Sequence, residues 1–158
     1  MIKNCRLIFI IACLSGSYIT FAQKVVVIKF ATLDSLLQKN DTIYVINFWA
    51  SWCRPCVIEM PYFDTLANDF RLNNVKVVFV SLDFKQDLDS VKKFVEDRKI
   101  KSPVYLLDEP DYDSWIDKIS PKWSGAIPAT LIIRGNKKAF YEQSFDYQTL
   151  TEKVKHFF

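Results

Sequence analysis

The chain alternates between two hydrophobic patterns from residue 24 onward. Short, nearly continuous apolar runs predict strands that are buried in a sheet, and segments with apolar residues every three to four positions predict amphipathic helices. The expected strands are residues 25–30, 43–49, 75–82, 104–107, 129–134 and 138–142. The expected helices are residues 32–39, 53–70, 88–98, 112–119 and 150–157.

The order of these elements predicts the fold class. Strands and helices alternate as far as residue 119, which favours parallel strands joined by crossover helices. The last two strands are separated by Gly135-Asn136, a hairpin turn signal, and Asp146 is suited to cap the final helix. No linker rich in Gly, Ser or Pro interrupts this order. We therefore expect one α/β domain over residues 23–158, with a mixed central sheet flanked by helices.

The first 22 residues read as a signal peptide rather than as part of this domain. Lys3 and Arg6 form a short basic region, residues 7–14 are apolar, and Thr20-Phe21-Ala22 offers a cleavage site before residue 23. The apolar run is too short to span a membrane. A lipoprotein signal is the alternative, because residues 10–13 resemble a lipobox that ends at Cys13. Either route predicts an exported protein of the periplasm or outer cell envelope.

Removal of this segment changes the charge and the cysteine content. The whole chain has a formal net charge of +3, and loss of Lys3 and Arg6 leaves it near neutral. Such a balance favours neither nucleic acid nor an anionic membrane as a partner. Cys5 and Cys13 also belong to the segment. The mature chain would then hold one cysteine pair, three residues apart, at Cys53 and Cys56.

Four explanations for a Cys-x-x-Cys pair compete. A structural zinc site needs four ligands, and the mature chain adds only His156, so zinc is disfavoured. A structural disulfide across so short a loop would restrict the unfolded chain little. Two inert buried thiols stay open, although a junction between strand and helix favours exposed sulfurs. The fourth explanation is a redox-active dithiol.

The position of the pair favours redox chemistry. Cys53 falls at the start of the expected helix 53–70, where free backbone amides and the helix dipole lower the pKa of a thiol. Cys56 lies one turn later and can close a disulfide with little movement. Arg54 adds positive charge, and Pro55 suits the first turn of a helix. A nucleophilic thiolate with a resolving thiol nearby is what thiol–disulfide exchange requires.

The sequence FWASWCRPC, residues 48–56, resembles the active-site segment of the thioredoxin superfamily, and WCRPCVIEMP resembles its exported TlpA/ResA-like branch. Pro61 matches the proline that bends the active-site helix of the family. GAIPATLII, residues 125–133, resembles the segment that carries the family's cis-proline, here Pro128. The extra helix and strand between residues 83 and 108 match the central insertion of the TlpA-like branch. The resemblance thus implies a thioredoxin-like fold with that insertion.

The resemblance also implies roles for further residues. A cis bond between Ile127 and Pro128 would hold backbone beside the cysteines to pair with an extended substrate. Trp52, together with Arg54 and Pro55, would belong to the substrate-binding surface. Trp49 would either brace the active-site loop and add to that surface, or simply pack in the core.

A proton-handling acid is expected at a different place from that in plain thioredoxin. Thioredoxin has a buried Asp where this chain has Asn47, which cannot transfer a proton. Glu59 matches the acid of the ResA-like branch and lies one helical turn beyond Cys56, so it could exchange protons with that thiol. The alternative is an ordinary Glu on the solvent face of the helix.

Other functional classes fit the sequence less well. A peroxiredoxin-type peroxidase needs Thr or Ser three residues before its cysteine and Pro four residues earlier still; before Cys53 these positions hold Ala50 and Ile46. A copper chaperone would need wider cysteine spacing and a histidine ligand. A non-catalytic thioredoxin-like binding module and a disulfide oxidase or isomerase of the same fold remain the alternatives.

The predicted function is therefore a protein-disulfide reductase that acts through Cys53 and Cys56. Its substrate would be a disulfide-containing exported protein, and relatives that reduce apocytochrome c make cytochrome c biogenesis one candidate process. A membrane thiol-electron donor would re-reduce it. We expect a monomer with no metal or other cofactor beyond the redox-active disulfide, since no glycine-rich phosphate loop is present.

Overall fold

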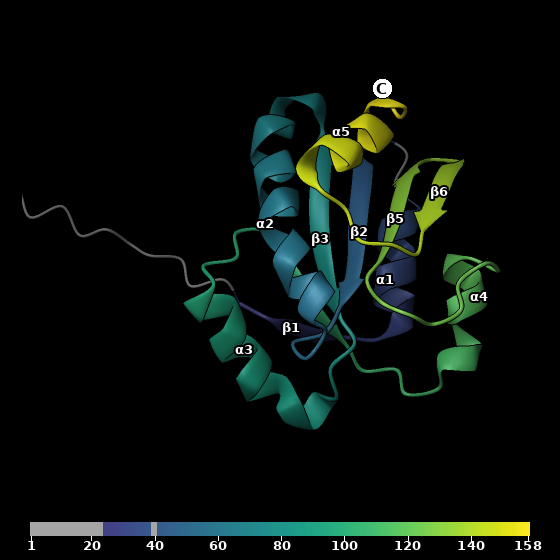
Figure 1. Cartoon of the computed structure of the whole chain (residues 1–158). Coiled ribbons are helices and arrows are strands. Elements are labelled where there is room, and N and C mark those ends of the chain that lie inside the picture. The colour runs from purple at the N-terminus through teal and green to yellow at the C-terminus, as the bar shows by residue number, and fades with distance from the viewer. Residues whose placement is uncertain (1–23, 39–40) are drawn as a thin grey trace, which may run out of the picture.

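The computed structural model describes residues 24–38 and 41–158, which form one α/β sandwich around a single sheet (Figure 1). The strands are β1 (Val26–Ile28), β2 (Ile43–Trp49), β3 (Val75–Ser81), β4 (Val104–Leu107), β5 (Ala129–Arg134) and β6 (Lys137–Tyr141). The helices are α1 (Phe30–Leu37), α2 (Arg54–Asp69), α3 (Leu88–Asp97), α4 (Ile116–Ile119) and α5 (Tyr147–Lys155). The short 3-10 helices are η1 (Arg71–Asn73), η2 (Lys85–Asp87) and η3 (Tyr112–Ser114).

The sheet is mixed, as the sequence predicts. Its strand order is β1-β4-β3-β2-β5-β6. The first four strands in this order run parallel, and β5 and β6 form an antiparallel hairpin beside β2. Parallel neighbours end at the same edge, so β1, β2, β3 and β4 all have their carboxyl ends at one edge of the sheet, which is the lower end of β2 in Figure 1.

The central insertion enters the sheet itself. The chain leaves β3, forms α3, and returns as β4, which lies between β1 and β3. The register places Val104 beside Phe79 and Tyr105 beside Val26. The insertion expected between residues 83 and 108 is therefore confirmed as one helix and one strand.

Helices cover both faces and enclose two hydrophobic clusters. In Figure 1, α2 and α5 lie in front of β2 and β3, and α1 lies behind the sheet. The front cluster includes Phe63 of α2 and Val91 of α3, and the rear cluster includes Leu33 of α1 and Ile119 of α4. β2 is buried along its whole length, because it lies between these two layers.

Three predicted boundaries are wrong at the ends of elements. The first strand is shorter than residues 25–30, because Phe30 turns into α1 and buries its ring there. The expected helix 112–119 is broken into η3 and α4 at Trp115, whose indole is buried and donates a hydrogen bond to the Glu109 carbonyl (3.2 Å). The last helix begins at Tyr147 rather than at residue 150, and the Asp146 carboxylate caps it by accepting the Thr149 N–H (2.7 Å).

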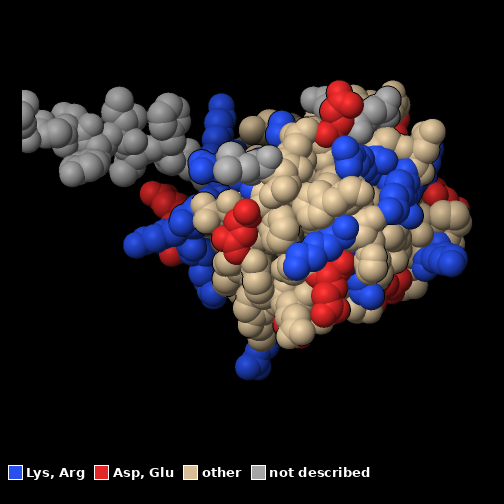
Figure 2. Space-filling model, turned by 90° about the horizontal axis from the view of Figure 1, so that it is seen from above, with Lys and Arg blue, Asp and Glu red and all other residues tan. Residues whose placement is uncertain are grey.

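Figure 2 shows the end of the molecule that carries the amino ends of β2 and β3, at the top of Figure 1. Lys and Arg side chains are interspersed with Asp and Glu on this face rather than gathered by sign. No helix among the described residues has the length and apolar character to cross a membrane. The predicted signal peptide, residues 1–22, lies outside the described residues.

Candidate active site

The cysteine pair lies where β2 passes into α2, at the carboxyl edge of the sheet. Cys53 is the N-cap residue of α2, with extended backbone, and its sulfur accepts a hydrogen bond from the Cys56 N–H (3.4 Å). The two sulfurs are joined in a disulfide of 2.01 Å. Pro55 occupies the first turn, where its missing N–H leaves no helical hydrogen bond unmade. The structure thus holds the pair at a helix N-terminus, as the sequence predicts.

The sulfurs are less exposed than a strand–helix junction suggests. Cys53 is 5% exposed and Cys56 is buried completely, and both pack in the front hydrophobic cluster. Trp52 projects into solvent with 70% exposure, and Arg54 and Pro55 are also exposed. Access to the disulfide is therefore confined to the small exposed surface of Cys53.

The loop before β5 lies on one side of the disulfide. The Ile127–Pro128 peptide bond is cis, as the resemblance implies. Ala129 pairs with Phe48 in the antiparallel register, so Pro128 enters the sheet beside the end of β2. Ile127 is half-buried and packs against the cluster that contains both cysteines. The fold thus brings together two segments that lie more than seventy residues apart in the sequence.

Glu59 is a buried acid one helical turn beyond Cys56. Its side chain is inside the protein, with only 1% of the residue exposed, so the solvent-face alternative is wrong. Asn47 Nδ2 donates to one carboxylate oxygen (2.8 Å), and the Phe145 N–H donates to the other (2.7 Å). Burial raises the pKa of Glu59 to about 7, and the bonds from Phe145 and Asn47 pull that pKa down only in part.

Asn47 has a role that the sequence does not reveal. It occupies β2 with its side chain buried, donating to Glu59 and also to Thr130 Oγ1 (3.3 Å). The carbonyl oxygen of this amide is buried without a hydrogen-bond partner among the described residues. An amide can present either its donor or its acceptor. Asn47 can therefore serve Glu59 both as a carboxylate and, after rotation, as a carboxylic acid.

A second buried acid, Asp83, supports the active-site loop. It lies two residues past the end of β3 and is 4% exposed. Its carboxylate accepts the Ser51 N–H (3.0 Å), the Ser51 hydroxyl (2.7 Å) and the Ser81 hydroxyl (2.7 Å). Sequence reasoning missed this residue; the available signal was an acid placed directly after a buried strand at the carboxyl edge.

The two tryptophans of the loop differ in environment. Trp49 is completely buried, and its ring centroid lies 5.3 Å from that of Phe94 in α3. The burial of Trp49 therefore favours the core-packing interpretation and excludes a docking role. Trp52 alone presents an indole to solvent.

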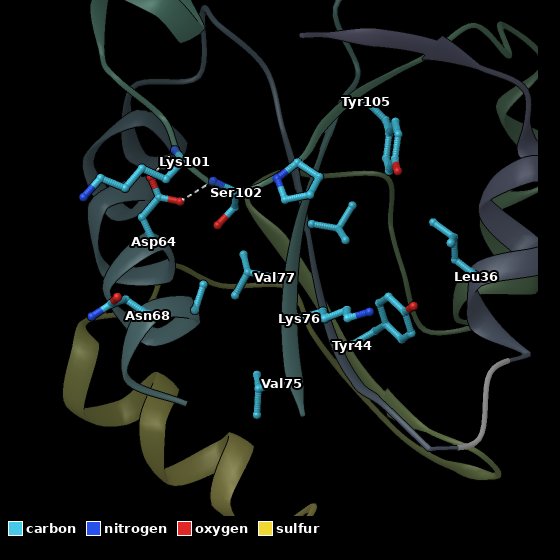
Figure 3. Close-up of a pocket in the computed structure, with 13 residues that line it drawn as sticks. Leu36, Tyr44, Asp64, Asn68, Val75, Lys76, Val77, Lys101, Ser102 and Tyr105 are labelled. Atoms are coloured by element: carbon cyan, nitrogen blue, oxygen red, sulfur yellow. Dashed lines mark hydrogen bonds between the residues drawn. The ribbon is translucent and has the colours of Figure 1, made fainter. Parts of the chain in front are cut away.

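One cavity lies away from the disulfide. It has a volume of about 500 Å³ near the amino ends of β2 and β3 and is lined by Tyr44, Val75 and Tyr105 among others (Figure 3). Asp64 closes one side by accepting the N–H groups of Lys101 and Ser102, both at 2.9 Å. The disulfide is at the opposite, carboxyl edge. This cavity is therefore not part of the cysteine site.

No group of side chains in the described part of the chain is arranged to hold a metal ion. His156 lies at the carboxyl end of α5, as its C-cap residue.

Comparisons with known proteins agree with this geometry. The model of the AhpC/TSA family matches residues 19–140. Thiol-disulfide oxidoreductase ResA of Oceanobacillus iheyensis is 38% identical over 60 residues, which cover 38% of this chain and 30% of that protein. Sporulation thiol-disulfide oxidoreductase A of Bacillus subtilis is 33% identical over 63 residues, covering 39% of this chain and 38% of that protein. The match spans well under half the length of these relatives.

Solved structures share the fold over a longer stretch. A thiol:disulfide interchange protein of the thioredoxin family from Chlorobium tepidum superposes with a TM-score of 0.62 at 22% identity, covering 78% of this chain and 83% of that one. StoA from Bacillus subtilis gives a TM-score of 0.56 at 23% identity, covering 72% and 83%. These likenesses establish a thioredoxin-like fold.

Proposed function

The chain belongs to the AhpC/TSA family, and from that premise we propose that it is a thiol-disulfide oxidoreductase that reduces disulfides of exported proteins through Cys53 and Cys56. One observation carries the proposal. The disulfide begins α2 at Cys53, a buried acid with a pKa near 7 lies one helical turn beyond Cys56, and the cis Ile127–Pro128 bond precedes the strand that pairs with the end of β2.

The first chemical step is attack by Cys53 on a substrate disulfide. In the reduced protein, the N-terminal amides of α2 and the guanidinium of Arg54 stabilise the Cys53 thiolate. A new bond forms between Cys53 and one substrate sulfur, and the substrate disulfide breaks. The departing substrate thiolate takes a proton from solvent. Backbone at Ile127 would pair with the substrate chain and hold its disulfide in line with Cys53.

The second step resolves this mixed disulfide. Cys56 must lose its proton before it attacks Cys53, and Glu59, one helical turn further along α2, would accept that proton. A carboxyl group with a pKa of about 7 is present in both protonation states near neutral pH, so it can take up a proton and release it again. The Cys53–Cys56 bond forms, the second substrate sulfur leaves as a thiol, and two electrons have passed to the substrate.

The oxidised protein must then be reduced by an external dithiol. An exported protein has no access to cytosolic reductants, so a membrane thiol-electron donor is the partner that completes the cycle. The relatives named as thiol-disulfide oxidoreductases support the reaction class. Cleavage after residue 22, or lipid attachment at Cys13, would place the domain in the periplasm or outer envelope as a monomer. Reduction of apocytochrome c is one role that such a protein could fill.

Substitution of the two cysteines tests the proposal. Cys53→Ser should abolish reduction of insulin disulfides in a dithiothreitol-coupled turbidity assay, because the thiol that remains, Cys56, is completely buried and cannot reach a substrate disulfide. Cys56→Ser should retain the first step and accumulate covalent adducts with exported proteins, visible as bands that dithiothreitol removes. Wild-type activity in Cys53→Ser would rule out the mechanism. Absence of adducts with Cys56→Ser would favour a non-catalytic binding module.

A measurement of the equilibrium with glutathione tests the direction of electron flow. A reductase should form its disulfide at low ratios of oxidised to reduced glutathione, whereas an oxidase should stay reduced until that ratio is high. The Cys53→Ser variant provides the baseline, because it cannot form the disulfide.

A further inference from the structure

An aromatic side chain outside the cysteine motif is exposed beside the active site. Phe84 follows Asp83 in the turn after β3 and is 62% exposed. Trp52, in the turn after β2, is 70% exposed. Large aromatic side chains that remain in water at a functional edge mark a site that another molecule covers. The two turns belong to neighbouring parallel strands, so they emerge at the same edge.

Hydrogen bonds hold these two turns side by side. The Leu82 N–H donates to the Trp49 carbonyl (2.8 Å), which continues the pairing of β3 with β2 past the last registered pair. One residue further along, the Asp83 carboxylate accepts both the N–H and the hydroxyl of Ser51. Trp52 and Phe84 are the next residues in their respective turns, directly after Ser51 and Asp83. The position of Phe84 relative to Trp52 is therefore fixed by the backbone.

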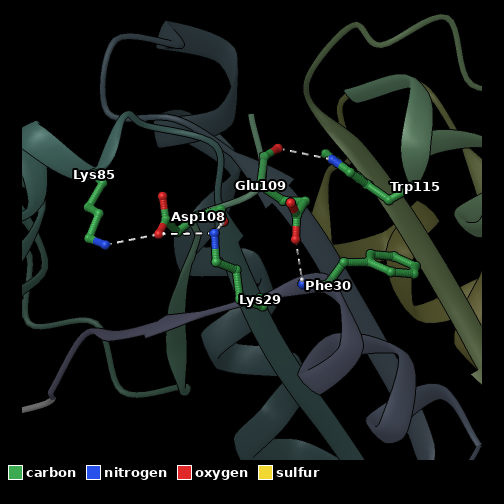
Figure 4. Close-up of polar contacts among 6 residues, drawn as sticks. All are labelled: Lys29, Phe30, Lys85, Asp108, Glu109 and Trp115. Carbon is green, nitrogen blue, oxygen red and sulfur yellow. Dashed lines mark hydrogen bonds and ion pairs between the residues drawn. The ribbon is translucent and has the colours of Figure 1, made fainter. Parts of the chain in front are cut away.

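The turn is also held from its other side (Figure 4). Lys85, the neighbour of Phe84, forms an ion pair with Asp108 at the end of β4 (3.0 Å), and Lys29 pairs with the same carboxylate (3.3 Å). The hydrogen bond from Lys85 and the nearby charge of Lys29 lower the pKa of Asp108, so this carboxylate is ionised at neutral pH. The Asp87 N–H donates to the Phe84 carbonyl (2.9 Å), closing the turn. Phe84 thus has a rigid backbone under an exposed ring.

We propose that Phe84 and Trp52 together form a docking surface for an extended polypeptide segment that carries an aromatic or aliphatic side chain next to its disulfide. This inference rests on the proposed function and adds the kind of substrate that the site prefers. The active-site loop has Ile127 and Pro128 on its β5 side and Phe84 on its β3 side. A substrate chain paired with Ile127 would cross Cys53 and reach the two aromatic rings.

The chemistry of the surface favours a polypeptide over a small thiol compound. Aromatic anchors on a fixed backbone lose little conformational entropy on binding and gain by burying apolar area. A small hydrophilic disulfide offers no apolar group to cover two rings. Lys85, the sequence neighbour of Phe84, is paired with Asp108 rather than directed at a ligand.

The test compares two substrates in one variant. The substrates are a synthetic peptide disulfide with Phe next to each cysteine, and hydroxyethyl disulfide; dithiothreitol is the reductant in both assays. Phe84→Ser should lower kcat/KM for the peptide about tenfold, mainly through a higher KM, and leave the rate with hydroxyethyl disulfide within about twofold of the wild type. Phe158→Ser is the matched control, because Phe158 is 52% exposed and follows α5 at the end of the molecule away from the disulfide.

The outcomes separate three cases. Selective loss with the peptide in Phe84→Ser, and not in Phe158→Ser, supports the docking surface. Equal loss with both substrates would mean that the substitution disturbs the active-site loop, and unchanged kinetics with both would mean that Phe84 contacts no substrate; either result overturns the inference. A wild-type protein that reduces neither substrate would instead refute the proposed function. Phe84→Leu keeps an apolar side chain and should restore most of the peptide activity.

Discussion

Two buried carboxyl groups lie under the active-site loop, and they differ in how the protein surrounds them. Glu59 is a residue of α2 and lies among apolar residues of the front cluster. Each of its carboxylate oxygens accepts a hydrogen bond from one N–H group. Asp83 follows β3 at the edge of the sheet and receives three different donor groups from Ser51 and Ser81. Both residues are nearly inaccessible to solvent. Burial alone therefore does not determine what an acid does.

The difference lies in the balance between desolvation and hydrogen bonding. For Glu59 desolvation dominates and raises the pKa into the neutral range, where proton transfer to and from a thiol is effective. The groups that donate to the Asp83 carboxylate come from the ends of two different strands. Their hydrogen bonds to this carboxylate connect those two ends. We interpret Glu59 as the group that moves a proton and Asp83 as the group that positions the loop. The following substitutions test this distinction.

Loss of Asp83 should have the larger effect on stability. Asp83→Ala leaves the Ser51 N–H and the two serine hydroxyls without their acceptor, which should lower the free energy of unfolding by about 3 kcal/mol. Urea denaturation of the oxidised protein at pH 7 measures this loss. Asp83→Asn is the control: it keeps one acceptor oxygen for Ser51, and its amide can donate to Ser81, so it should cost about 1 kcal/mol. Equal stability of both variants and the wild type would mean that Asp83 does not stabilise the active-site loop.

Glu59 should make the free energy of unfolding depend on pH, and substitutions of Asp83 should not remove this pH dependence. The pKa is 4.5 for an ordinary Glu and about 7 for folded Glu59, so above pH 4.5 the unfolded chain loses this proton while the folded protein retains it. The free energy of unfolding should therefore fall as pH rises, by about 3 kcal/mol in total by the time the pH exceeds 7.

Glu59→Gln has no proton to lose and should abolish this pH dependence of stability. The same variant should shift the pH profile of the resolving step, measured by single-turnover release of the second substrate thiol. Urea midpoints of wild type and variant at about pH 3.5, 6 and 8 provide the stability test, because these points bracket the two pKa values. If the urea midpoints of the two proteins depended on pH in the same way, Glu59 would have only a structural role.

Asn47 should have the smallest effect, because it tunes Glu59 rather than replacing it. Its hydrogen bond lowers the pKa of Glu59, so Asn47→Ala should move the Glu59 transition upward by about half a pH unit. Thr130→Val is the matched control, since Thr130 accepts a hydrogen bond from Asn47 and none from Glu59. A downward shift in Asn47→Ala would mean that the amide stabilises the neutral acid instead.

The sequence predicts the parts of this molecule that repeat a local pattern. The bounds of β2, β4 and β5 match their apolar runs, because strands buried on both faces have little tolerance for polar residues. The same reasoning does not predict the element boundaries at Phe30 and Trp115. Each is an apolar residue at an element boundary, and its packing partners, including the contact between their own rings at 6.0 Å, come from distant segments.

The candidate site divides in the same way. Cys53, Cys56 and the helix they begin are adjacent in the sequence, so spacing and helix geometry were enough to relate them. The environment of Glu59 depends on Asn47 in β2 and on Phe145 before α5, and no local pattern indicates that these meet. The same holds for Asp83 and Ser51, and therefore for the placement of Phe84.

The sequence by itself determined the dithiol, the α/β order of elements and the resemblance that places the cis bond at Pro128, since each is written in contiguous residues. Only the tertiary structure decided that Glu59 is buried with a pKa near 7, that Asp83 connects the turns after β2 and β3, and that these two turns expose Trp52 and Phe84. The reason is physical: a pKa and a hydrogen-bond network depend on which groups surround a side chain, and those groups come from strands and helices that meet only when the sheet assembles.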